Sequence, residues 1–151
     1  MMEQPLILND RFDLPVLSTA GKTGSRFLTE LRDNQRIMGL KCSQCNIVYV
    51  PPKSVCTCYD QLDEWVEVSN EGVLTACTVV NEMYSDLYQP KKAPYGLGII
   101  KLDGADTGLC HFVNETDPSK LKVGARVKVV FKDKNQRQAS ILDIDHFEVT
   151  G

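Results

Sequence analysis

The alternation of hydrophobic and polar residues indicates β-structure along most of the chain. Between residues 126 and 132, Val127, Val129 and Phe131 alternate with mostly basic residues, as in a strand with one buried face. Turn-forming residues separate several such segments, and no helical pattern extends over ten residues or more in this part of the chain. Regularly spaced strands of this kind are typical of an all-β sandwich or barrel. After residue 63 the predicted strands are 64–69, 73–83, 96–102, 107–113, 126–132 and 139–149.

Short polar segments are predicted to connect these strands. Residues 70–72 are expected to form the first turn, because Gly72 can adopt a positive φ. Residues 103–106 have the composition of a hairpin turn, and residues 133–135 are predicted to form the last turn. Residues 117–124 are expected to form a single helical turn.

A short helix is predicted before the first strands. Ser25 is placed to cap it, since a serine hydroxyl can accept a free backbone N–H of the first turn. Asp33-Asn34 should end it, because these side chains favour turns. About two turns are too short to be stable alone in water, so the helix must pack on another element. Its packing face is predicted to consist of Phe27, Leu28 and Leu31.

The first 24 residues have no regular period but are rich in apolar residues. A disordered terminus is usually polar, so the arm Leu6–Leu17 is expected to lie against a surface of this chain or of a partner. The alternative is an unstructured terminus.

Composition and charge narrow the class of protein. The 151 residues are 42% hydrophobic and 25% charged, as in a folded globular chain of one domain or two small ones. No segment approaches the roughly 20 apolar residues that span a bilayer, and residues 1–10 lack the features of a signal peptide. A cytoplasmic location without membrane contact is therefore predicted. The net charge is −3, and neither half of the chain is basic, so the electrostatic signature of a nucleic-acid binder is missing.

Four cysteines form the strongest chemical pattern in the sequence. Cys42-x-x-Cys45 is followed after ten residues by Cys56-x-Cys58. A reducing cytoplasm argues against disulfides, and structural Zn²⁺ takes four sulfur or nitrogen ligands in a tetrahedron. A zinc site with all four cysteines as ligands is therefore predicted. The alternatives are that only some of them bind, that they are packing residues, or that they hold an iron–sulfur cluster.

The remaining cysteines and the histidines do not form a recognisable catalytic site. Cys77 and Cys110 lie in apolar strands and are predicted to be packing residues. His111 and His146 also lie in strands, apart from other candidate ligands.

Acidic residues and catalytic motifs add no further candidate. Asp143 and Asp145 are expected to share a solvated strand face. The sequence has no nucleophile elbow, Walker A loop or helical HExxH motif. No catalytic residue is predicted, and no cofactor-binding residue beyond the metal ligands is assigned.

The order of these features resembles that of the acyl-CoA-associated proteins that join a rubredoxin-like zinc ribbon to an OB-fold. The resemblance extends from about Phe27 to Phe147. It implies a mainly β fold with an N-terminal arm and short helix in 1–35, a zinc ribbon in 36–63 and an OB-fold β-barrel in 64–151. The shortened Cys56-x-Cys58 pair departs from the family's pattern. The resemblance is carried by Gly39, Cys42, Cys45, Pro51, Pro52, Lys53, Cys56, Cys58, Trp65, Gly72, Pro94, Tyr95, Leu102, Gly124 and Val127.

The resemblance also implies a function. Members of this family are small accessory subunits of thiolase-like enzymes, in which the large subunit supplies the catalytic cysteine and histidines. The small subunit stabilises the hetero-oligomer and helps to shape the CoA channel. The family thus implies structural zinc on Cys42, Cys45, Cys56 and Cys58, and acyl-CoA bound mainly by the partner.

Three elements are predicted to make the contacts with such a partner: the ribbon, the arm, and the loop Tyr84–Lys92. The loop carries two tyrosines and a leucine beside two lysines that could meet CoA phosphates, although it could equally be a solvated connection. Lys53 is a further candidate for a phosphate contact. Two other functions stay open: a single-stranded nucleic-acid-binding module, and an acyl carrier or scaffold without an enzyme partner.

Overall fold

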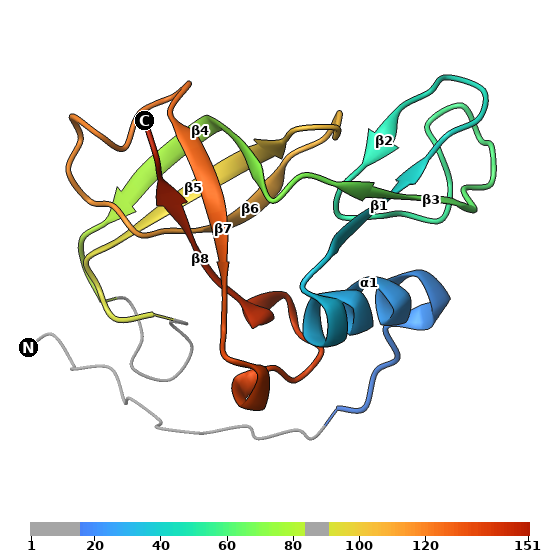
Figure 1. Cartoon of the computed structure of the whole chain (residues 1–151), viewed down its shortest axis with the longest axis horizontal. Coiled ribbons are helices and arrows are strands. Elements are labelled where there is room, and N and C mark those ends of the chain that lie inside the picture. The colour runs from blue at the N-terminus through green and yellow to red at the C-terminus, as the bar shows by residue number, and fades with distance from the viewer. Residues whose placement is uncertain (1–15, 84–90) are drawn as a thin grey trace, which may run out of the picture.

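The computed structural model describes residues 16–83 and 91–151, and strands predominate in it (Figure 1). This confirms the prediction of a mainly β fold with one short helix near the N-terminus. The elements in chain order are α1 (Gly21–Asn34), β1 (Ile37–Lys41), β2 (Val48–Tyr49), β3 (Glu64–Val68), β4 (Glu71–Val80), β5 (Tyr95–Leu102), β6 (Leu109–Val113), β7 (Arg126–Phe131), the 3₁₀ helices η1 (Lys134–Gln136) and η2 (Ile141–Asp143), and β8 (Ile144–Val149). None of the described helices is long and apolar enough to cross a membrane.

Five strands close into a barrel in the order β4-β5-β6-β8-β7, as predicted for an OB-fold. All pairs are antiparallel except β6 with β8. The barrel is filled by side chains that alternate along the strands, as the sequence pattern of β7 predicts. The fully buried side chains of the barrel include Leu74, Ile100, Leu102, Val113, Val127, Ile144 and Phe147.

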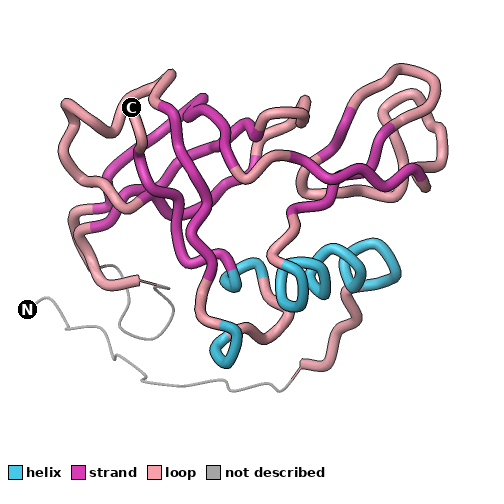
Figure 2. Tube along the Cα trace, in the orientation of Figure 1, coloured by secondary structure: helices cyan, strands magenta, loops and turns pink. Residues whose placement is uncertain are grey.

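A second, smaller sheet has the strand order β2-β1-β3 and projects from the barrel (Figure 2). We call residues 37–68 the ribbon. The prediction that the strand 64–69 belongs to the barrel was wrong, because β3 pairs with β1 in a register that joins Ile37 to Val68. A strand's own pattern does not specify its partner, which depends on the rest of the fold. The predicted boundaries of the three regions of the chain stay a prediction.

Helix α1 begins at Gly21, four residues before Ser25, the predicted cap. Ser25 lies inside the helix and does not cap it; the Gly21 N–H is instead bonded to the Thr19 hydroxyl oxygen at 3.1 Å. The helix ends at Asn34, as predicted, because Gln35 takes a left-handed conformation with φ 53°. The predicted apolar face is present, with Phe27 and Leu31 buried and Leu28 packed against the core.

Helix α1 packs beside both the base of the ribbon and the end of the barrel that carries η2 (Figures 1 and 2). Phe27, Leu31, Ile37 and Val50 belong to the same hydrophobic cluster as the barrel interior. A single core therefore runs from the barrel through α1 to the base of the ribbon. This continuity limits independent movement of the ribbon base, since a shift there would expose buried apolar surface.

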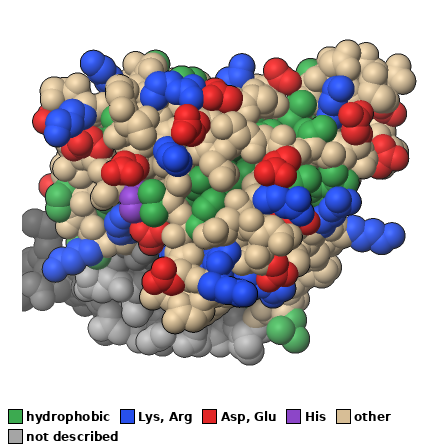
Figure 3. Space-filling view, in the orientation of Figure 1, with side chains coloured by type: hydrophobic (Ala, Val, Ile, Leu, Met, Phe, Trp, Pro, Cys, Tyr) green, Lys and Arg blue, Asp and Glu red, His purple; other side chains and the backbone are tan. Residues whose placement is uncertain are grey.

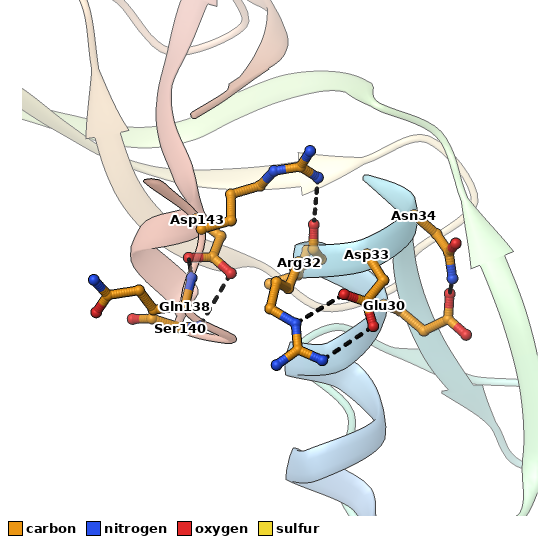
Figure 4. A network of polar contacts seen from close by, with 9 residues as sticks. Glu30, Arg32, Asp33, Asn34, Gln138, Ser140 and Asp143 are labelled. Atoms are coloured by element: carbon orange, nitrogen blue, oxygen red, sulfur yellow. Dashed lines mark hydrogen bonds and ion pairs between the residues drawn. The ribbon is translucent and has the colours of Figure 1, made fainter. Parts of the chain in front are cut away.

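Polar contacts reinforce the docking of α1 beside η2 (Figure 4). Arg137 Nη1 lies 3.5 Å from the Leu31 carbonyl oxygen at the end of the helix. The Asp143 carboxylate accepts the N–H groups of Gln138 at 2.8 Å and Ser140 at 3.2 Å. The prediction that Asp143 lies on a solvated strand face was wrong: it is 2% exposed and belongs to the capping box of η2, which precedes β8. Its carboxylate is buried because it satisfies backbone donors.

The two glycines predicted for turns differ in role. Gly104 has φ +92° in the turn between β5 and β6, as a hairpin requires. Gly72 lies inside β4 rather than in a turn, and a Cβ there would come within 2.3 Å of the Lys101 carbonyl oxygen. Close approach of β5, rather than positive φ, is the reason for glycine at position 72.

Candidate metal centre

The structure brings the four predicted cysteines together at the end of the ribbon that is farthest from the barrel. All four Sγ atoms lie within 4.8 Å of one another. Cys42 and Cys58 Sγ are 3.6 Å apart, and Cys45 and Cys56 Sγ are 3.4 Å apart. Four sulfurs placed at about 2.3 Å from a central Zn²⁺ would be separated by roughly 3.8 Å. The donor set and its spacing therefore fit a single tetrahedral ion, and ligation itself stays a prediction.

The first cysteine pair lies in a turn closed by two backbone hydrogen bonds. The Asn46 N–H donates to the Cys42 carbonyl oxygen at 2.9 Å, and the Cys42 N–H donates to the Ile47 carbonyl oxygen at 2.9 Å. Asn46, directly after Cys45, has φ 57°. Asparagine tolerates this left-handed conformation better than most residues.

The second pair lies in a turn of the same kind that is one residue shorter. The Tyr59 N–H donates to the Cys56 carbonyl oxygen at 3.0 Å, and the Cys56 N–H donates to the Asp60 carbonyl oxygen at 2.9 Å. Tyr59, directly after Cys58, has φ 68°. The tighter turn expected for Cys56-x-Cys58 is therefore present, and it brings both sulfurs to the same point as the longer first turn does. We call the two turns, residues 42–47 and 55–61, the ribbon tip.

Hydrogen bonds to sulfur favour the thiolate at Cys56. The backbone N–H of Cys58 and the Tyr49 hydroxyl, 3.2 Å from Cys56 Sγ, lower the pKa of Cys56 to about 5. Such donors stabilise negative charge on sulfur.

Crowding acts in the opposite direction at Cys45. A backbone N–H from Ile47 lowers the pKa of Cys45, but the neighbouring sulfurs of Cys42 and Cys56 outweigh it and raise this pKa to about 12. Four thiolates so close together repel one another, and a bound divalent cation would remove that penalty.

The core of the ribbon is small and includes candidate ligands. Two cysteines account for a large part of it, and Tyr49 reaches into it from β2. The Lys53 ammonium lies 3.9 Å from the centre of the Tyr49 ring, over its aromatic face. A phosphate contact of Lys53 stays a prediction. The buried members of this cluster are Leu40, Cys42, Tyr49, Cys56 and Leu62.

Cys77 and Cys110 lie on the barrel, away from the ribbon. Cys77 is half-buried and packs against the core, with Sγ 3.5 Å from the Leu121 carbonyl oxygen. The prediction that Cys110 is a packing residue was wrong: its side chain is exposed, because β6 buries Leu109, His111 and Val113 and turns the intervening residues outward. Because β6 is mostly apolar, its sequence does not show this alternation of buried and exposed positions. Both cysteines line a groove on the barrel surface with Ala76, Thr78, Leu97, Gly98 and Ile99.

Neither histidine joins the cysteines. His111 is 4% exposed, its Nε2 lies 3.1 Å from the Ile141 carbonyl oxygen, and burial lowers its pKa. His146 Nδ1 lies 2.7 Å from Asp145 Oδ2. Across residues 16–83 and 91–151, the four cysteines are the only group of three or more Cys, His, Asp or Glu side chains arranged to hold a metal ion.

The other predicted contact elements are described only in part. Positions 6–15 of the arm and 84–90 of the loop lie outside the described residues. Val16 and Leu17, which follow the undescribed part of the arm, are exposed.

Comparison with known proteins bears on the barrel first. Residues 65–132 match the family model for the C-terminal OB-fold domain of ChsH2. The matched residues include the barrel strands β4 to β7, so most of the barrel is similar to that domain. The resemblance to the acyl-CoA-associated zinc-ribbon and OB-fold family, predicted from the sequence, is thereby confirmed.

Relatives match a larger share of the chain than the family model does. The chain is 25% identical over 104 residues to a DUF35 domain-containing scaffold protein of Methanocaldococcus jannaschii, a match that covers 68% of this chain and 72% of that protein. A crystal structure of a DUF35-family protein of unknown function from Sulfolobus solfataricus has a TM-score of 0.62 and 25% identity, covering 86% of this chain and 87% of that one. The Ltp2–ChsH2(DUF35) aldolase structure, with a TM-score of 0.57, 19% identity and coverage of 83% and 93%, shares the fold.

Proposed function

We propose that this chain is a non-catalytic, zinc-binding OB-fold subunit of a thiolase-like acyl-CoA enzyme. It stabilises the larger subunit and helps to form the channel for CoA and its acyl group. The observation that carries the proposal is the combination of a barrel similar to the ChsH2 OB-fold domain with a ribbon that presents four clustered cysteines. The complex is a cytoplasmic hetero-oligomer in which the large subunit holds most of the acyl-CoA.

Zinc is the ion that the site suits best. All four positions of a tetrahedron are supplied by protein sulfur, which leaves no open position for water or substrate and is the arrangement of structural zinc. Sulfurs 3.4 and 3.6 Å apart are in contact, so the space between them suits one ion rather than a cluster of iron and sulfide. When bound, zinc would offset the thiolate charge and cross-link the two turns.

The chemistry of the complex is assigned to the partner. His111 is enclosed in the barrel beside Phe112 and Phe147, and Cys110 faces the opposite side of β6. A nucleophile and a base must lie within hydrogen-bond reach of each other, and these two residues point to opposite faces of the strand.

The names of two relatives support an enzyme subunit as the partner. One is named a scaffold protein, and another forms an aldolase together with Ltp2. A thiolase-like subunit that makes or cleaves a carbon–carbon bond next to a CoA thioester is the partner that this chain would serve. Benzoylsuccinyl-CoA thiolase is one candidate enzyme.

The test is co-expression of the tagged full-length chain with the thiolase-like protein encoded nearest to its gene. We expect the two to co-purify as a stable complex, with one zinc ion for each copy of this chain. Thiolysis by the complex should exceed that of the large subunit alone. A large subunit that is stable, fully active and never retained by this chain would contradict the proposal.

The alternative of single-stranded nucleic-acid binding would require a basic surface. On the face shown in Figure 3, lysine and arginine side chains are interspersed with aspartate and glutamate rather than gathered into one groove. Salt-dependent, submicromolar binding of a labelled oligonucleotide would favour that alternative over the accessory-subunit function.

A further inference from the structure

Tyr59 is the most exposed aromatic side chain among the described residues, and it lies in the ribbon tip. Its side chain is 90% exposed, although it stands between Cys58 and Asp60 in a turn that places both cysteines. Its φ of 68° lies in the left-handed region, where a bulky residue is an outlier. The Tyr59 ring therefore contributes little to packing, and its backbone conformation is unfavourable for tyrosine.

The first cysteine turn shows which residue type the left-handed position after a cysteine pair requires for folding alone. There the equivalent position, directly after Cys45, is Asn46, with φ 57° and the same backbone hydrogen bond across the turn. Asparagine and glycine are the residues that adopt this conformation with least strain. Neither turn geometry nor burial accounts for tyrosine at position 59, and its exposed ring is available for a contact outside this chain.

The surroundings of Tyr59 are apolar and acidic. Val55, 41% exposed, lies on the same turn, where it pairs with Gln61. The ribbon tip contains Asp60 and no lysine or arginine, and Asp63 follows it. Four thiolates around one zinc ion would add two net negative charges.

The nearest basic side chains already have partners. Lys53 lies over the Tyr49 ring, and Lys41 Nζ lies 3.7 Å from Glu64 Oε1. The ribbon tip therefore presents an exposed phenol and a valine within a negative field.

We propose that the ribbon tip is a docking surface for the large subunit, and that Tyr59 inserts into an apolar pocket of that subunit rimmed by lysine or arginine. This inference rests on the proposed function and specifies where the two subunits meet. Tyrosine suits the centre of an interface because it buries a large area with few rotatable bonds and retains a hydroxyl for a polar contact. Complementary charge around it would accelerate association.

The experiment measures the affinity of the zinc-loaded full-length chain for the large subunit, using Tyr59→Asn with Val123→Asn as the matched control, since Val123 is exposed but lies outside the ribbon. Tyr59→Asn places in the second turn the residue that the first turn already uses, so its zinc content should match wild type and its thermal midpoint should be equal or higher. Its Kd for the large subunit should rise on the order of tenfold or more. Val123→Asn should bind like wild type. Asp63→Lys should slow association, and the effect should shrink as salt is added.

Hydroxyl-radical footprinting of the wild-type chain tests the same contact without a substitution. Tyr59 should be oxidised in the free chain and protected in the complex. If wild type binds but Tyr59 stays reactive, or Tyr59→Asn binds equally well, the docking inference is wrong and the proposed function stands. If wild type does not bind the large subunit at all, the proposed function itself is contradicted.

Discussion

The ribbon and the barrel are both small β-sheets, but different forces hold them together. The barrel interior is a cluster of fully buried aliphatic and aromatic side chains, with Phe147 and Ile144 both 0% exposed. In the ribbon, two of the five buried cluster members are cysteines, and β2 is only two residues long. A sheet this small buries too little apolar surface to be stable by itself, so we expect its end to depend on the proposed metal cross-link.

The base of the ribbon does not share this weakness. Ile37 and Val50 belong to the same cluster as the barrel interior, and helix α1 packs beside them. The difference between the two regions is therefore a gradient along the ribbon, from hydrophobic packing near the barrel to clustered cysteines, the proposed metal ligands, at the tip.

Removal of the metal should have the largest effect and should separate the two regions. Structural zinc contributes roughly 10–16 kcal/mol of binding free energy in zinc-finger peptides, and here that free energy would act on the ribbon tip. Cys42→Ser should lose zinc, and hydrogen exchange should become fast in residues 42–63 while the strands of the barrel stay protected. Mass spectrometry of exchanged peptides and metal analysis measure both.

Cys110→Ser is the matched control for that experiment. Cys110 is exposed on the barrel, so this variant should keep its zinc and its exchange pattern. Unchanged protection of the ribbon tip in Cys42→Ser would mean that the tip is held by packing instead.

Truncation of the barrel core should have the next largest effect and should act on the whole chain. Phe147→Ala removes a fully buried ring and leaves a cavity, so the free energy of unfolding should fall by about 3–5 kcal/mol. Because the core continues into α1 and the ribbon base, denaturant unfolding should shift as one transition. Zinc content should stay at the wild-type level under native conditions.

Ile99→Ala provides the comparison on the same barrel. Ile99 is 43% exposed, so its truncation should change stability by less than about 0.5 kcal/mol. A Phe147→Ala variant with wild-type stability would show that the barrel interior tolerates the cavity. The barrel would then depend less on hydrophobic packing than its buried side chains indicate.

Mild acid should have the smallest effect, and it should arise in the barrel. Burial lowers the pKa of His111 below its ordinary value of about 6.5, so the unfolded chain binds a proton that the folded chain does not. Stability should therefore decrease as the pH falls through 6.5 toward the lower folded pKa. Denaturant midpoints between pH 7.5 and 6 should show this slope in wild type and not in His111→Gln.

His146→Gln is the control for the histidine experiment, since its ring pairs with Asp145 at the barrel surface. It should retain most of the slope between pH 7.5 and 6. An equal slope in His111→Gln would place the titrating group elsewhere.

Local patterns in the sequence were enough to predict several features. The spacing of the cysteines predicted the cluster, the period of Phe27 and Leu31 predicted the buried helix face, and the alternation in 126–132 predicted a barrel strand. Each depends on residues a few positions apart, whose relative directions are set by the geometry of a turn, helix or strand.

Other features were decided only by tertiary structure. The pairing of β3 with β1, the burial of Asp143, the exposure of Cys110 and the close approach at Gly72 were all missed from the sequence. Each depends on which distant segment lies alongside. A run of apolar residues such as the one in β6 does not indicate which of its side chains face the core. The sequence by itself therefore determined the type of most elements and the clustering of the cysteines. The predicted strand 139–149 was wrong in its first part, because residues 141–143 form η2 and β8 begins at Ile144. Closure of the barrel and docking of the ribbon decided partners and faces, because those are set by contacts between segments far apart in the chain.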